Sequence, residues 1–293
     1  MSNYSELCVE DSNLLGTGVG NCPKLLGPDV MFILSEDTLT GTAAELKTKA
    51  FWDAKIKSKE AFIFPLVREV EPQNVEATYF EAGDGSSYLI KDEVRKTMYQ
   101  FIENIVTHSG MKSYANRGWN IWYYTEQGYL RCHTKGVDSY EGLKASRFYV
   151  NAQTTQTFTD ALHTPVIIEQ ADVNDWDMEY GVIQPDFDMK DLEGVFQADV
   201  VEVSSTQVTG TLTVNIKVSV KGTNTPLAGL LPADFNLIDE SGATVTVDTA
   251  VESPSGTYAI VATDDATTGT IGLKDVVTIG TDNYQSVLIP FAV

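Results

Sequence analysis

Residues 212–220 read LTVNIKVSV and decide the fold of the region around them. Apolar and polar side chains alternate strictly along this stretch, which is typical of a β-strand with one buried and one exposed face. More short segments rich in strand-forming residues follow, separated by turn residues at intervals of about 8 to 12 residues. This rhythm predicts a small β-sandwich over residues 206–293.

A second stretch in this region, residues 252–262, reads ESPSGTYAIVA and places a turn cluster directly before a strand. Gly256 suits the tight turn, and the alternation then predicts that Tyr258 and Ile260 face the core. The region lacks the Cys–Trp–Cys spacing of true immunoglobulin domains. We therefore expect a sandwich that is immunoglobulin-like in architecture only.

The preceding part, residues 1–205, is predicted to be a separate, mainly β domain that begins with a glycine-rich arm over about residues 1–28. A buried strand is expected at 30–34. One helix is expected over 40–59, because Thr42 and Glu45 have the spacing of a capping box. Further strands are expected between 61 and 203, among them a hairpin over 119–133. Residues 94–107 fit a strand or a helix equally well.

The strongest signal in the composition is charge. The 293 residues include 41 acidic and 20 basic ones, so the net charge is −21. Residues 206–293 contain nine acidic residues and three lysines, a net charge of −6, which leaves −15 on residues 1–205. Affinity for a phosphate backbone depends on clustered Lys and Arg. The composition therefore argues against nucleic-acid binding. The negative charge serves either solubility alone or a surface that nucleic acid passes without adhering.

No arrangement of residues predicts catalysis or cofactor binding. The three histidines, His108, His133 and His163, stand in separate segments without metal-binding spacing. Residues 172–179 resemble a calcium loop in composition but break its ligand order. We predict no enzyme activity, no cofactor and no metal, and interpret this segment as an acidic loop facing solvent or a lumen.

Two sets of residues are candidates for a role in assembly. The acidic set, predicted to face a lumen or an acidic surface, comprises Asp172, Asp175, Asp177, Glu179, Asp186 and Asp188. The second set, predicted to contact a neighbouring subunit, comprises Lys47, Lys55, Lys57, Lys59, Trp119 and Trp122. The aromatic residues at 119–124 could alternatively form a platform for a sugar.

Four segments, residues 15–23 (LGTGVGNCP), 75–81 (VEATYFE), 119–130 and 164–169 (TPVIIE), resemble virion structural proteins of the tail-tube type from phages and prophages of Bacteroides-like bacteria. The resemblance covers about residues 10–203. It implies a β-sandwich or barrel with one flanking helix, whose subunits form stacked rings bridged by a long hairpin and terminal arms. An added C-terminal immunoglobulin-like decoration domain is common in phage tail and capsid proteins.

The resemblance implies a homo-oligomer that contacts other virion proteins and conducts DNA without binding it specifically. It also implies no membrane partner, and a location in the phage tail after assembly in the bacterial host cytoplasm. The ambiguous pattern at 94–107 leaves the ring-lining hairpin unassigned. The alternatives are another virion component, such as a neck ring, head decoration or tail-tip protein, and a glycan-binding surface module.

Overall fold

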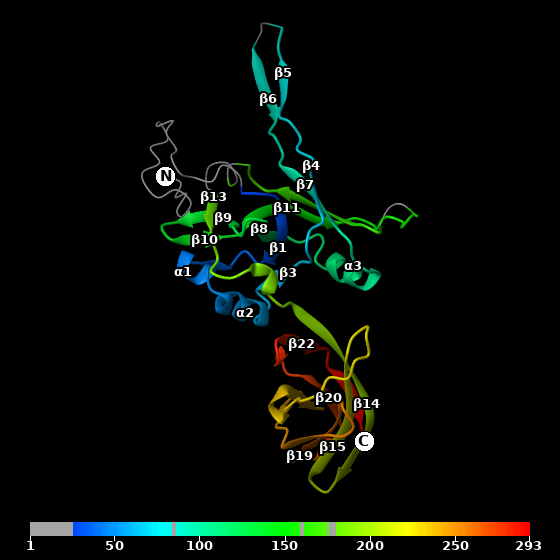
Figure 1. Ribbon diagram of the computed structural model, residues 1–293. Coiled ribbons are helices and arrows are strands. Elements are labelled where there is room, and N and C mark those ends of the chain that lie inside the picture. Colours follow the sequence, from blue (N-terminus) through cyan, green and yellow to red (C-terminus); the bar gives the residue numbers. More distant parts are fainter. Residues whose placement is uncertain (1–25, 84–85, 159–160, 174, 176–179) are drawn as a thin grey trace. The chain divides into compact units, whose positions relative to one another are not determined.

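The computed structural model describes residues 26–83, 86–158, 161–173, 175 and 180–293. The described chain is mainly β, as predicted, and divides into two compact units (Figure 1). Unit 1 extends to Leu192, and unit 2 comprises Glu193–Val293.

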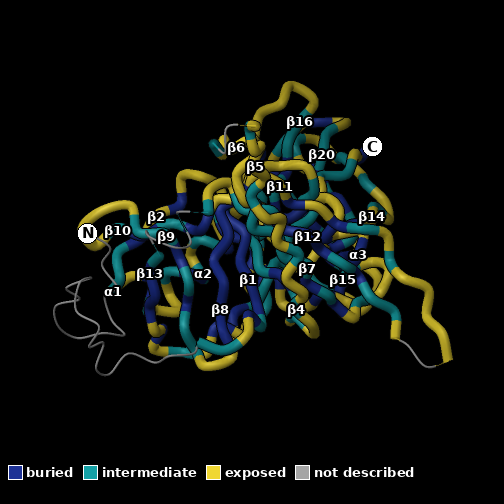
Figure 2. Tube along the Cα trace, turned by 90° about the horizontal axis from the view of Figure 1, so that it is seen from above, coloured by how far each residue is buried: buried dark blue, intermediate teal, exposed yellow. Residues whose placement is uncertain are grey.

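Unit 1 is built on an 11-stranded sheet around the antiparallel pair β1 (Asp29–Ser35) and β8 (Trp119–Thr125). Every residue of β8 is buried, and Figure 2 shows this pair in the buried centre of the unit. The main path runs β2-β10-β9-β8-β11-β12-β7-β4, while β1, β3 and β13 pair beside it. The other strands are β2 (Thr40–Gly41), β3 (Ala61–Ile63), β4 (Glu69–Pro72), β7 (Lys96–Phe101), β9 (Leu130–Gly136), β10 (Ser139–Glu141), β11 (Leu143–Val150), β12 (Thr164–Gln170) and β13 (Tyr180–Ile183).

Aromatic side chains fill the core on one face of this sheet. Phe32 of β1 is fully buried, and its ring stacks on Phe64 with the centroids 4.9 Å apart. Tyr99 and Phe101, both on β7, form T-shaped pairs with the same ring, with centroid distances of 5.4 and 5.7 Å. Each such aromatic pair contributes about 0.5–1.5 kcal/mol of stability beyond the contribution from burial of its apolar area. The apolar run at 30–34 therefore becomes the central strand.

The predicted single helix over 40–59 is wrong in its extent. Residues 40–41 form β2, and two helices follow, α1 (Ala43–Leu46) and α2 (Lys49–Lys57). The capping box is confirmed: the Glu45 amide donates to Thr42 Oγ1, and the Thr42 amide donates to Glu45 Oε2 at 2.9 Å. The helix breaks because Thr48 has extended backbone angles, φ −95° and ψ 136°.

The ambiguous segment 94–107 contains a strand and the start of a third helix. After β7 the chain enters α3 (Ile105–Lys112), whose N-cap Asn104 accepts hydrogen bonds from the amides of Val106 and Thr107 at 2.9 Å. Unit 1 thus has three α-helices in its described residues, whereas one flanking helix was expected.

A long antiparallel ribbon leaves the sheet of unit 1. It begins with the pairing of β4 and β7 and continues through reciprocal backbone hydrogen bonds between Val75 and Val94, both 2.9 Å. It then becomes the hairpin of β5 (Thr78–Glu81) and β6 (Ser87–Lys91). The ribbon and its hairpin extend away from the sheet (Figure 1).

Unit 2 is a two-sheet sandwich. One sheet has the order β18-β19-β15-β14-β22-β21 and the other β17-β16-β20-β23. Buried side chains from both sheets, such as Val214, Leu237 and Ile271, form one core. The strands are β14 (Val195–Val208), β15 (Thr211–Val220), β16 (Phe235–Asp239), β17 (Thr244–Val245), β18 (Thr249–Glu252), β19 (Thr257–Ala262), β20 (Thr268–Leu273), β21 (Val277–Ile279), β22 (Asp282–Ser286) and β23 (Ile289–Ala292).

The predicted domain boundary at 205/206 falls inside a strand and is corrected to 192/193. The ladder between β14 and β15 runs from the pair Ala198–Val220 to the pair Val208–Thr211, with one bulge along it. The first residues of β14 pair in parallel with β22. The strand therefore belongs to the sandwich over its whole length.

The stretch 252–262 behaves as predicted. Tyr258 and Ile260 of β19 are buried in the sandwich core, and the Tyr258 hydroxyl donates to the Leu227 carbonyl at 2.8 Å. Gly256 has φ +73°, and a Cβ there would lie 2.7 Å from Cβ of Pro226. Only glycine fits this turn without strain.

Candidate functional site

The structure places the predicted acidic set at several separate positions. Asp172 and Asp186 are exposed. Asp188 caps the 3-10 helix η1 (Met189–Asp191), because its Oδ1 accepts from the Lys190 amide at 3.0 Å. Asp175 Oδ1 lies 3.9 Å from His133 Nε2. Asp177 and Glu179 lie outside the described residues.

The predicted lysine patch makes contacts within its own unit. Lys55 pairs with Glu60 at 2.8 Å and lies over the ring of Phe51, 5.8 Å from its centroid. The Lys47 carbonyl accepts from the Asp186 amide at 3.1 Å, so the lysine and acidic segments meet inside one chain. Lys57 and Lys59 are exposed. A subunit contact through these two lysines stays a prediction.

Trp119 and Trp122 are not surface residues, so their predicted role in subunit contact is wrong. Trp119 is 3 % exposed, and its indole donates to the Tyr114 carbonyl at 2.8 Å. Trp122 is fully buried, with its indole donating to Ser35 Oγ at 2.9 Å. The continuous burial of β8 also leaves no aromatic platform for a sugar on this strand. Both faces of a central strand are covered, and the sequence pattern did not show this.

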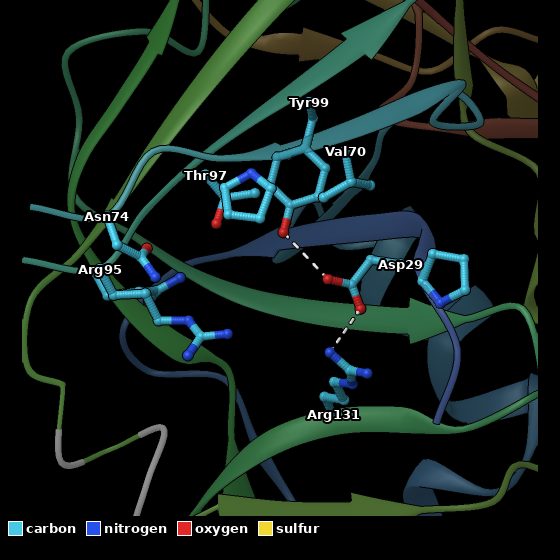
Figure 3. A pocket seen from close by; sticks show the side chains of 10 residues that line it. Asp29, Val70, Asn74, Arg95, Thr97, Tyr99 and Arg131 are labelled. Carbon is cyan, nitrogen blue, oxygen red and sulfur yellow. Dashed lines mark hydrogen bonds and ion pairs between the residues drawn. The ribbon is translucent and has the colours of Figure 1, made fainter. Parts of the chain in front are cut away.

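A cavity of about 230 Å³ opens among the ends of five segments of unit 1 (Figure 3). β1 supplies Asp29, β7 supplies Thr97 and Tyr99, and β9 supplies Arg131. Arg95 stands directly before β7. The full lining is Pro28, Asp29, Val70, Pro72, Asn74, Arg95, Thr97, Tyr99, Arg131 and Gln170.

A buried ion pair forms one wall of this cavity. Asp29 Oδ1 lies 3.2 Å from Arg131 Nη1, and the Tyr99 hydroxyl donates to Asp29 Oδ2 at 3.2 Å (Figure 3). Arg131 Nη2 also donates to the Gly27 carbonyl at 3.0 Å. These contacts fix the orientation of the Asp29 carboxylate, at the start of β1, and of the Arg131 guanidinium, on β9.

Burial changes the acid–base chemistry of this wall. Burial raises the pKa of Asp29 above its ordinary value, and the attraction of Arg131 and the Tyr99 hydrogen bond oppose that rise in part. Burial also raises the pKa of Tyr99 well above 10, helped by the nearby Tyr123 and Asp29. Tyr99 therefore remains a hydrogen-bond donor at neutral pH.

Basic side chains outnumber acidic ones in the described lining of the cavity, although the chain as a whole is strongly acidic. Its lining contains two guanidinium groups, of Arg95 and Arg131, and one carboxylate, of Asp29. In Figure 3 the Arg95 side chain extends into the space between Asn74 and Arg131. The Tyr99 hydroxyl has one proton and donates it to Asp29, so it is not a further donor toward the cavity.

An acidic cavity of about 470 Å³ lies beside the first and shares Gln170 with it. Its charged lining residues are Lys91, Asp92, Glu93, Glu169 and Asp172. Of the predicted acidic set, Asp172 is the member placed here. No group of three or more His, Cys, Asp or Glu residues in the described ranges is arranged to hold a metal ion.

The sequence did not reveal the cavity beside Asp29. Its charged residues, Asp29, Arg95 and Arg131, come from three distant segments and belong to no motif. One signal was present: Asp29 adjoins the apolar run at 30–34, where a charged side chain needs a partner when it is buried. The identity of that partner depends on the pairing of the strands.

Comparison with known protein families finds no match for this chain, and no curated protein matches it either. None of the helices in the described part of the chain is long and apolar enough to cross a lipid bilayer.

Proposed function

We propose that this chain is a structural phage virion protein, a subunit of a tail tube or ring that assembles into a negatively lined conduit for DNA. The observation that carries the proposal is the exposed apolar hairpin of β5 and β6. The acidic composition and the resemblance of four segments to tail-tube proteins support it.

Both faces of the hairpin carry large apolar side chains. Tyr79 is paired with Leu89, and Phe80 with Tyr88, so the two pairs point to opposite faces. Together with Ile90, these five side chains are each between 50 % and 65 % exposed. Within the described residues, β5 and β6 pair only with each other.

A two-stranded hairpin with no packed face is at best marginally stable in water. Contiguous exposed apolar side chains mark surfaces that bind a partner. Because both faces are apolar, one covering surface would leave the other in water. Insertion of the hairpin between neighbouring copies of this chain covers both, as expected for a subunit of a ring or of stacked rings.

The charge of the chain is compatible with conduction of DNA. Phosphate groups adhere to clustered Lys and Arg through release of counterions. A wall of exposed carboxylates repels them instead. Asp172 and Asp186 are exposed members of the predicted lumen set. In this proposal unit 2 is an external decoration domain.

Negative-stain microscopy and light scattering of the purified protein at high concentration test the proposal. We expect rings or tubes for the wild type, and smaller particles for the double variant Phe80→Ser/Tyr88→Ser. Val137→Ser is the matched control, because Val137 is 92 % exposed in a different turn of the same unit. A wild type that stays monomeric, or an inner wall that is mainly cationic, overturns the proposal.

A further inference from the structure

We propose that the start of α3 is the surface on which the β5–β6 hairpin of a second copy docks, so that copies of the chain associate head to tail. This surface, the α3 patch, consists of Ile102, Ile105 and Val106. The inference rests on the proposed function, because it names the place where the hairpin of that proposal binds.

The α3 patch is apolar and exposed. Ile102 is 47 % exposed, Ile105 64 % and Val106 61 %. The other side of the helix is anchored in unit 1, because His108 and Met111 are buried. The patch is therefore held in water by a helix that is itself packed. Neighbouring exposed apolar side chains of this kind mark a surface that binds a partner.

The hairpin and the α3 patch lie at opposite ends of β7 (Figure 1). Pairing with β4 on one side and β12 on the other holds β7 extended. From Val94 in the ribbon to Ile102 the chain spans about 26 Å, at about 3.3 Å per residue. The hairpin extends still further from the patch, so it cannot fold back onto the patch of its own chain. The hairpin of another copy can reach it.

The distribution of charge favours the same pairing. Residues 75–94, which contain the hairpin, include five acidic residues and one lysine, a net charge of −4. Residues 102–117 include the exposed Lys112 and Arg117 and one acidic residue, the half-buried Glu103, a net charge of +1. Two α3 patches placed face to face would bring their basic groups together and leave the hairpins uncovered. A hairpin on the patch matches apolar side chains and opposite charges.

A contact between two different surfaces of identical chains leaves one hairpin and one patch unused at the ends of every assembly. Such a heterologous contact repeats from copy to copy until a ring closes or a filament grows. The α3 patch then covers one face of the hairpin, and a further neighbour covers the other.

Sedimentation velocity of two full-length variants tests the docking. The hairpin variant is Phe80→Ser/Tyr88→Ser, and the patch variant is Ile105→Ser/Val106→Ser. Each loses one of the two surfaces, so each alone should need at least about tenfold higher concentration than the wild type to associate. An equimolar mixture should form one-to-one pairs, because the intact hairpin of one variant docks on the intact patch of the other. A mixture that associates no better than the separate variants overturns the proposal.

A reversal of charge tests the same contact without removing apolar side chains. Lys112→Glu/Arg117→Glu should weaken association by about tenfold or more, because it places carboxylates opposite the acidic ribbon. Addition of Glu76→Lys/Glu81→Lys to the same chain should restore most of the loss. Absence of recovery overturns the proposal. This experiment still decides if the patch variant does not fold.

Unit 2 offers matched controls for both experiments. Leu231→Ser/Val251→Ser replaces side chains that are 64 % and 58 % exposed, and Lys221→Glu/Lys274→Glu reverses two exposed lysines. Both controls should associate like the wild type. Weakening in a control equal to that in its test variant overturns the assignment to α3.

The outcomes separate this inference from the proposed function. If the wild type assembles and the patch variant assembles equally well, the docking is wrong and the proposed function stands. If the two variants pair in the mixture but the inner wall of the wild-type assembly is mainly cationic, the proposed function is wrong and the docking stands. A wild type that is monomeric at every concentration overturns both.

Discussion

Asp29 and Arg131 form an ion pair of 3.2 Å inside unit 1, with 7 % and 15 % of their side chains exposed. Asp29 begins the central strand β1, and Arg131 lies on β9, across β8. Removal of two charges from water costs several kcal/mol per ion, so such a pair adds little net stability, while loss of one partner is expensive.

Replacement of one partner should therefore be more harmful than replacement of both. We expect Arg131→Gln to lower the free energy of unfolding by about 3–5 kcal/mol, because it leaves the buried Asp29 without its counterion. The double variant Asp29→Asn/Arg131→Gln should recover most of that loss. Urea titration of the wild type, the two single variants and the double variant measures these changes in the free energy of unfolding. A double variant as unstable as the sum of the two single variants would contradict this account.

The same carboxylate predicts a pH dependence. The folded state holds the Asp29 proton more tightly than the unfolded chain does, because burial raises the pKa. The stabilisation that protonated Asp29 gives the folded state is therefore fully present below pH 3.8, the ordinary pKa. It is lost as pH rises through the raised pKa of the folded state. Relative to Asp29→Asn, the wild type should lose stability over that range, by about 1.4 kcal/mol for each pH unit between the unfolded and folded pKa values. A stability difference that grows with pH would show that Arg131 outweighs burial.

Gly256 tests the turn that starts β19. Gly256→Ala should destabilise unit 2 by about 2 kcal/mol or more, because it combines a left-handed backbone with a clash against Pro226. Gly222→Ala is the matched control: its φ is +90°, but nothing lies within 4 Å of the added Cβ. Hydrogen exchange of β15 and β19 amides reports the effect. Equal losses in both variants would exclude the clash as the cause.

Cys132 tests the burial of β9. Its thiol is fully buried, and burial raises its pKa, so the reactive thiolate is scarce at neutral pH. We expect iodoacetamide to leave Cys132 unmodified in native protein and to modify it in denaturant, as read by mass spectrometry of its peptide. Rapid modification of Cys132 in the native protein would show that unit 1 opens readily at this strand.

Most strands were predictable because their alternation or apolar runs are local. The segments at 30–34 and 212–220 both became strands, and the Thr42–Glu45 capping box formed as its spacing required. The single helix over 40–59 failed because a capping box fixes where a helix begins and carries no information about where it ends. Thr48 adopts extended angles, and a second helix starts after it.

The surroundings of the candidate site residues could not be predicted from local sequence patterns. The sequence around Trp122 fits a surface position as well as a core position. Only the pairing of β8 with β1 buries this side chain. Likewise, strands were expected between residues 61 and 203, and β5 and β6 lie in this range. That these strands form a ribbon with both faces in water depends on how β4 and β7 leave the sheet.

By itself the sequence determined a mainly β chain, a C-terminal sandwich and a strong excess of negative charge, because strand alternation and total charge depend on residue order and composition alone. The tertiary structure decided which charges meet. Asp29, Arg95 and Arg131 come together only because strands far apart in the chain are neighbours in one sheet. Their juxtaposition places two arginines and one aspartate around one small cavity, which no local pattern encodes.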